Sequence, residues 1–179
     1  MTTFRRSIIA LFVLGSMASG CTTMSTSLRE LIDEGNNQKA MEKGQRWMDK
    51  NAQKPKHRQE ADVIVVLVCE AEYNLTEKTD TVDGYRYFRN RYSGVRGVDE
   101  FLDRALSREA SAYYRDVTTR EDTVAAYQDF QKSYPDAFER GRALAREAEL
   151  ALARAEGLKG TGELRSFLGI YGFNAEAAP

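Results

Sequence analysis

Large hydrophobic side chains recur along this chain at positions i, i+3 and i+7. Three copies of the pattern follow one another: Tyr85, Phe88 and Tyr92; Tyr127, Phe130 and Tyr134; and Leu164, Phe167 and Tyr171. Successive copies lie 42 and 37 residues apart, and Trp47 marks a weaker copy upstream. This spacing places three apolar groups on one face of a helix. Each such helix therefore needs a partner packed against that face.

A turn signal follows each copy, and a longer helical pattern follows three of these turns. The longer segments are 59–73, 98–114 and 138–156. The first contains a β-branched run that could also form a strand, but its charged and alanine-containing flanks favour a buried helix. The third is rich in alanine, glutamate and arginine, which favour helix.

Helix starts are indicated by residues that can cap a helix N-terminus. Asp80 and Asp122 each precede a short helical pattern and are predicted N-caps. Ser27 and Glu30 fit a capping box that opens a first short helix over 28–34.

Together these signals predict an all-α fold in which short and long helices alternate. The hairpins are about 40 residues long, and each buries its apolar stripe against the next. We expect a short α-solenoid of antiparallel helical hairpins with three to four repeats. It spans residues 27–172, and 173–179 form a C-terminal tail.

The N-terminal segment has the three parts of a secretory signal. Arg5 and Arg6 precede an apolar run over 8–14, and small residues at 18–20 precede Cys21. The apolar run is far shorter than the roughly 20 residues that a membrane-spanning helix needs. The segment therefore predicts a cleaved signal and not a membrane span.

The sequence Ala-Ser-Gly-Cys at 18–21 resembles the lipobox of bacterial lipoproteins. The resemblance implies that a diacylglycerol is attached to the Cys21 thiol and that residues 1–20 are removed. Residues 21–26 then form the lipidated N-terminus and a short tether. The alternative is an ordinary secretory signal that leaves an incidental cysteine.

Two details qualify this resemblance. Lipoboxes usually have Leu where this chain has Ala18. Thr22 and Thr23 follow the cysteine, and the absence of Asp there implies sorting to the outer membrane, facing the periplasm. Two or more acyl chains provide stable anchoring.

The second aromatic copy carries a further resemblance. Tyr127, Phe130, Tyr134 and Pro135 resemble the second helix and proline turn of a tetratricopeptide-type repeat. Such helices are common in bacterial envelope lipoproteins, including the helical-repeat lipoprotein of the outer-membrane β-barrel assembly machine. The likeness covers about 40–172 and implies a tetratricopeptide-like architecture.

Charge argues against some ligands. Without residues 1–20, which contain Arg5 and Arg6 and no acid, 159 residues remain, with 24 basic and 27 acidic side chains. The net charge of −3 argues against nucleic-acid binding, which requires an excess of basic side chains. Mixed charge of this kind is typical of solvated helix faces.

The chain contains two cysteines. With Cys21 used by the lipid, Cys69 has no partner for an intramolecular disulfide. Cys69 directly follows the apolar run 63–68, so we expect a buried, inert thiol.

No pattern of residues indicates catalysis or metal binding. His57 is the only histidine and lies in a basic turn, where we expect it to be solvated. Three acid pairs are expected at helix starts or on exposed faces: Asp99 and Glu100, Glu121 and Asp122, and Glu147 and Glu149. The sequence therefore predicts neither an enzyme nor a bound metal or cofactor.

One short helix carries the best candidate for a partner-binding surface. Arg86, Arg89 and Arg91 alternate with aromatic residues, and they and Tyr87 lie off the predicted buried stripe. Arg and Tyr are enriched at interface hot spots. Tyr114 is a second candidate, and a solvated face is the alternative for both. Nucleic acid is not an expected ligand in the periplasm.

These observations predict a lipid-anchored periplasmic scaffold or assembly factor. Its expected partners are the membrane, through the lipid, and another envelope protein. Two alternatives stay open: a pilotin-like escort of a secretin or pilus component, and a ligand-binding accessory of a transporter.

Overall fold

The computed structural model describes residues 23–157 and 161–172 of the chain. All regular secondary structure in these residues is helical, which confirms the predicted all-α fold. The α-helices are α1 (Met24–Asp33), α2 (Asn37–Asn51), α3 (Arg58–Thr79), α4 (Val82–Tyr92), α5 (Asp99–Asp116), α6 (Val124–Ser133), α7 (Arg140–Gly157) and α8 (Thr161–Tyr171). A 3₁₀ turn, η1 (Pro55–His57), precedes α3, and a π-helical turn, η2 (Val117–Glu121), follows α5.

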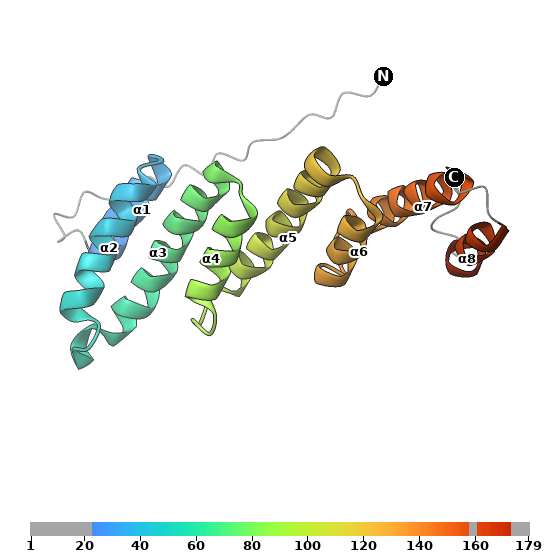
Figure 1. Cartoon of the computed structure of the whole chain (residues 1–179). Coiled ribbons are helices and arrows are strands. Elements are labelled where there is room, and N and C mark those ends of the chain that lie inside the picture. The colour runs from blue at the N-terminus through green and yellow to red at the C-terminus, as the bar shows by residue number, and fades with distance from the viewer. Residues whose placement is uncertain (1–22, 158–160, 173–179) are drawn as a thin grey trace, which may run out of the picture.

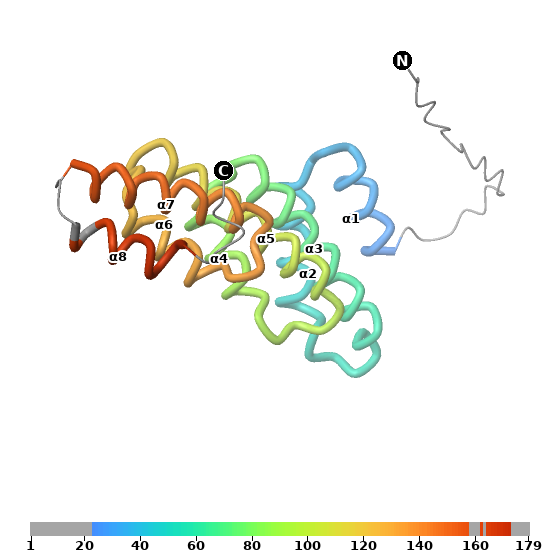
Figure 2. The backbone as a smooth tube through the Cα atoms, turned by 90° about the vertical axis from the view of Figure 1, so that its right-hand side faces the viewer, coloured from blue at the N-terminus to red at the C-terminus, as the bar shows by residue number. Residues whose placement is uncertain are grey.

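The helices form a solenoid of short–long hairpins. The closest packing joins α2 to α3, α4 to α5 and α6 to α7, while α1 covers α2 and α3 and α8 lies on α7. Figure 1 shows the helices following one another from α1 at one end to α8 at the other, and Figure 2 shows the same stack from the side. Helices contact their neighbours in sequence, which is typical of a helical-repeat protein.

The core is divided into three successive clusters. The first lies among α1, α2 and α3 around Leu28 and Ile64. The second lies around Tyr73 and Phe88, and the third around Phe130. The β-branched run is part of the 22-residue helix α3 and not a strand.

Three predicted helix starts are wrong. Helix α1 begins at Met24, because the Thr23 side chain and not Ser27 caps it. The N-caps of α4 and α6 are Thr81 and Thr123, whose hydroxyls accept a backbone N–H three residues later. The preceding aspartates, Asp80 and Asp122, instead close α3 and η2 in a left-handed backbone conformation.

In the part of the chain that the structure describes, no helix is both long and apolar enough to cross a membrane.

Candidate partner-binding surface

The arginines of α4 are held by a buried carboxylate. Glu109 of α5 is 2% exposed. Its Oε1 accepts a hydrogen bond from Arg86 Nε at 3.3 Å, and its Oε2 accepts one from Arg89 Nη1 at 2.6 Å. The hydroxyl of Tyr134, at the end of α6, donates to Glu109 Oε1 at 2.8 Å. One carboxylate therefore joins α5 to the short helices on both sides.

This arrangement recurs along the solenoid. The long helices α3, α5 and α7 each bury one glutamate, and each accepts a hydrogen bond from a tyrosine hydroxyl of the following short helix: Glu72 from Tyr92, Glu109 from Tyr134, and Glu147 from Tyr171. These tyrosines are the third members of the three aromatic copies.

Glu147 was expected on an exposed face, and this prediction is wrong. It is 4% exposed, because Gln128 and Gln131 of α6 and Tyr171 of α8 enclose its carboxylate with hydrogen bonds. Acidic residues are rarely buried unless paired, so the composition of α7 gave no sign of it. The signal in the sequence is the recurrence of a long-helix glutamate every 37 or 38 residues, each followed 20 to 25 residues later by the last tyrosine of an aromatic copy.

The second partners of these carboxylates differ in charge between repeats. Glu147 is bound by Gln128 and Gln131, which occupy the α6 positions equivalent to Arg86 and Arg89 of α4. Glu72 is bound by Arg91 Nη1 at 3.0 Å. Among the described residues, every buried polar side-chain atom has a hydrogen-bond partner.

The tyrosines of this network remain protonated at neutral pH. Burial and the adjacent Glu109 raise the pKa of Tyr134 to about 12. Burial and Glu147 raise the pKa of Tyr171 to about 12 as well. Burial and Glu72 raise the pKa of Tyr92 well above its usual range. Each hydroxyl therefore donates to its carboxylate throughout the physiological pH range.

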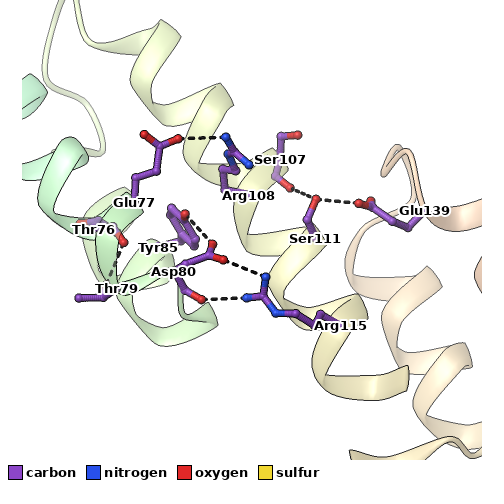
Figure 3. Close-up of polar contacts among 10 residues, drawn as sticks. All are labelled: Thr76, Glu77, Thr79, Asp80, Tyr85, Ser107, Arg108, Ser111, Arg115 and Glu139. Carbon is purple, nitrogen blue, oxygen red and sulfur yellow. Dashed lines mark hydrogen bonds and ion pairs between the residues drawn. The ribbon is translucent and has the colours of Figure 1, made fainter. Parts of the chain in front are cut away.

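A second repeated contact joins the helix turns. Asp80 Oδ1 accepts a hydrogen bond from Tyr85 Oη at 2.9 Å, and Asp80 Oδ2 accepts one from Arg115 Nη1 at 2.8 Å. Arg115 Nη2 also donates to the Asp80 carbonyl at 2.9 Å. Figure 3 shows Arg115 of α5 bound to a side-chain oxygen and to the backbone carbonyl oxygen of Asp80. The guanidinium thus fixes the turn between α3 and α4 against α5.

The equivalent turn before α6 is held in the same way. Asp122 accepts from Tyr127 Oη at 2.9 Å and from Arg146 of α7 at 2.7 and 3.0 Å. Hydrogen bonds from Arg146 and Tyr127 lower the pKa of Asp122. Burial opposes ionisation of Asp80, but hydrogen bonds from Tyr85 and Arg115 outweigh it and lower its pKa.

Two more polar contacts link successive long helices. Arg108 of α5 donates to Glu77 of α3 at 3.1 Å, and the Ser111 hydroxyl donates to Glu139, just before α7, at 2.7 Å (Figure 3). Polar contacts along α5 therefore connect it to the repeats on both sides.

The five residues expected to bind a partner do not form one cluster. Arg86, Tyr87, Arg89 and Arg91 all belong to α4. Tyr114 instead packs against Phe130 and Tyr127 of α6, with its ring centroid 5.3 Å from that of Phe130.

Tyr87 is the large side chain that α4 presents to solvent. It is 62% exposed. The side chains of Arg86, Arg89 and Arg91 on the same helix are between one third and one half exposed; the first two bind Glu109 of α5, and Arg91 binds Glu72 of α3. Because Glu109 and Glu72 neutralise much of their charge, this surface is a fixed array of guanidinium planes and one aromatic ring, and not a strong positive patch.

A second exposed aromatic residue, Phe138, was not predicted from the sequence. Phe138 was expected to open the third long helix, but α7 begins two residues later and Phe138 lies 84% exposed in the turn. It borders a cleft of about 220 Å³ lined also by Leu106, Pro135 and Tyr134.

His57 is half-buried: its ring packs edge-on against Trp47, and Nδ1 lies 3.3 Å from Glu60. Within the described ranges, no group of three or more His, Cys, Asp or Glu side chains could hold a metal ion. Cys21 lies outside the described residues.

Comparisons of the chain with protein-family profiles, with curated proteins and with solved structures found no match.

Proposed function

We propose that this chain is a lipid-anchored periplasmic scaffold or assembly factor that binds another envelope protein through the Tyr87 surface, defined as Arg86, Tyr87, Arg89 and Arg91 of α4. The observation that carries the proposal is the 62% exposure of Tyr87 on a helix whose arginines are held in position by buried carboxylates.

Fixed side chains reduce the entropic cost of binding. Ordering a rotamer-rich side chain at an interface costs about 0.5–1.5 kcal/mol. Arg89 and Arg91 are already oriented by Glu109 and Glu72 before a partner arrives. Each guanidinium also keeps an exposed portion that can stack on or donate to a partner. This supports a role in recognition by shape and hydrogen bonding more than by net charge.

The proposed anchor places this surface near a membrane. Helix α1 begins at Met24, so only Thr22 and Thr23 lie between Cys21 and the first helical residue. Two extended residues span about 7 Å. A lipid on Cys21 would hold the solenoid against the bilayer and would favour partners that are themselves in or close to that membrane.

Site-specific photo-crosslinking in cells tests the proposed surface. A photoreactive residue is placed at position 87, and the matched control carries it at position 63 of α3, where Val63 is 50% exposed. We expect a discrete adduct from position 87 and none from position 63. We also expect Tyr87→Ala to reduce co-purification of the captured protein by about tenfold or more, as truncation of a hot-spot residue does.

Equal labelling from both positions, or none from position 87, would contradict the proposed surface. The identity of the captured protein separates the possible roles, because a secretin or pilus component would favour the pilotin-like alternative.

A further inference from the structure

Helix α8 is the fourth short helix of the solenoid. Its Leu164, Phe167 and Tyr171 repeat the aromatic pattern of α4 and α6, and the Tyr171 hydroxyl binds Glu147 of α7 as Tyr134 binds Glu109 of α5. This shared hydrogen bond fixes the equivalence of positions between α8 and the other short helices. Helix α8 is therefore packed on the preceding long helix in the standard way.

The side of α8 that faces away from α7 differs from the equivalent side of α4 and α6. Helix α4 is covered by the following long helix α5, and α6 is covered by α7. Among residues 23–157 and 161–172, no helix covers α8 in the same way, as the end of the stack in Figure 1 shows.

The side chains on this side of α8 are more exposed to solvent than their equivalents on α4. Tyr85 of α4 is fully buried, whereas the equivalent Leu164 of α8 is 38% exposed. Leu168 is 60% exposed. Its equivalent in α4 is Arg89, which binds the buried glutamate of the following helix. Arg165 of α8, which is exposed, is the equivalent of Arg86.

Terminal repeats of solenoid proteins usually present a polar outer face, because an apolar one lowers solubility. On α8, the last helix of the described residues, Leu164 and Leu168 give this face an apolar surface at the positions equivalent to Tyr85 and Arg89 of α4. Large exposed apolar groups in such a place are typical of an interaction site.

We infer that the open face of α8, made of Leu164, Arg165 and Leu168, binds an amphipathic helix of a partner protein that places a carboxylate at Arg165. The α4–α5 interface is the template. There α5 lays its apolar face on α4, and Glu109 of α5 binds Arg86, the equivalent of Arg165. Leu168 stands where α4 has Arg89, the second partner of Glu109. A helix on α8 therefore needs a carboxylate that binds Arg165 alone, and apolar residues over Leu164 and Leu168.

This site is distinct from the Tyr87 surface. Its test uses the full-length protein reconstituted in lipid nanodiscs and a labelled peptide with the sequence of α5 (residues 99–116), which stands in for the partner helix. Binding is followed by fluorescence anisotropy.

We expect the peptide to bind the wild-type protein. Leu168→Glu should weaken binding by about tenfold or more, because it places a charge in an apolar contact. Val63→Glu on α3, the matched control, also places a charge on an exposed apolar residue and should leave binding unchanged. Circular dichroism should show the same helicity for all variants, because both altered side chains are exposed.

A charge exchange makes the test specific. Arg165→Glu should lose binding of the native peptide and regain it with a peptide that carries Glu109→Arg. The inference is overturned if the native peptide does not bind, or if Leu168→Glu binds it as well as wild type. It is also overturned if sedimentation shows that the wild type self-associates through Leu168, since the occupant would then be a second copy of the chain.

Discussion

The buried glutamates are the residues that tie each repeat to the next. Burying a carboxylate is costly unless hydrogen bonds and opposite charges compensate it. Glu109 meets this requirement with Arg86, Arg89 and Tyr134, which come from the two short helices on either side. Apolar packing alone would tolerate small shifts between these helices, whereas three directed contacts to one carboxylate do not. Glu109 thus sets the register of α4, α5 and α6.

Replacing this carboxylate should be costly. Glu109→Gln retains the shape but turns an amide N–H₂ toward the arginines. We expect the free energy of unfolding, measured by denaturant titration, to fall by about 2 kcal/mol, because hydrogen bonds to charged groups contribute about 1.5–3 kcal/mol. Glu149→Gln is the control, since Glu149 is 65% exposed in its pair with Arg146, and should change stability by less than about 0.5 kcal/mol. Equal effects of the two substitutions would refute the role of Glu109.

Cys69 should be chemically inert in the folded protein. It is fully buried, and burial together with Glu72 and Glu70 raises its pKa to about 12. At pH 8 only about one thiol in 10⁴ is then the reactive thiolate. In a Cys21→Ala background, where Cys69 is the only thiol, we expect no labelling by a thiol reagent until denaturant unfolds the chain. Rapid labelling of the native protein would show that the second core cluster is open.

The two turn aspartates predict acid sensitivity. The pKa values of Asp80 and Asp122 are lowered from the reference value of 3.8 in the folded state. Their contribution to stability is therefore present above about pH 4 and is lost as pH falls through their folded-state pKa values. We expect the free energy of unfolding to decline below about pH 4, and to decline less steeply in the Asp80→Asn, Asp122→Asn double variant. If stability declines with pH equally steeply in the double variant and in the wild type, these aspartates are not the cause of the decline.

At the scale of helices, hydrophobic spacing was sufficient to predict the hairpins. The i, i+3, i+7 aromatic copies identified α4, α6 and α8, because a large apolar stripe has few alternatives to burial. The helix ends were predicted less well. Asp and Thr are both good N-caps, so an adjacent Asp-Thr pair does not show which of the two residues caps the helix. In the structure the aspartates bind Arg115 and Arg146 instead, and the threonines cap.

The candidate surface was predicted in composition but not in detail. The sequence placed the α4 arginines off the buried stripe, but it could not show that their partners are buried glutamates on other helices. Such contacts link residues 19 to 23 positions apart, and they depend on how the helices pack.

The contact between α2 and α3 depends on a glycine. A Cβ atom added to Gly44 would lie 2.3 Å from Val68 Cγ2 and 3.2 Å from Leu28 Cδ1. Overpacking of this kind costs about 1–3 kcal/mol, which matches or exceeds the roughly 1 kcal/mol that alanine gains over glycine in a helix; a 2.3 Å approach to a branched side chain favours the upper part of that range. We expect Gly44→Ala to lower the free energy of unfolding. The control is Gly141→Ala on α7, where no atom lies within 4 Å of the added Cβ, and it should leave stability unchanged or raise it by up to about 1 kcal/mol.

At the scale of the whole molecule, the two ends of the solenoid differ. The N-terminal end is closed, because α1 covers α2 and α3, and the proposed lipid would be attached there. The α8 end is open in the described part of the chain. The Tyr87 surface lies between them. The proposed scaffold would thus be held at one end and would offer partners two surfaces farther along the stack.

The most direct test of a membrane-anchored scaffold is the distribution of the Cys21→Ala chain between the membrane and soluble fractions of the cell envelope, compared with wild type. The account predicts that the wild type sediments with membranes, and that the variant becomes soluble while its circular dichroism shows the same helicity as that of the wild type. A Cys21→Ala protein that stays with the membranes would contradict lipidation of Cys21 as the cause of its location.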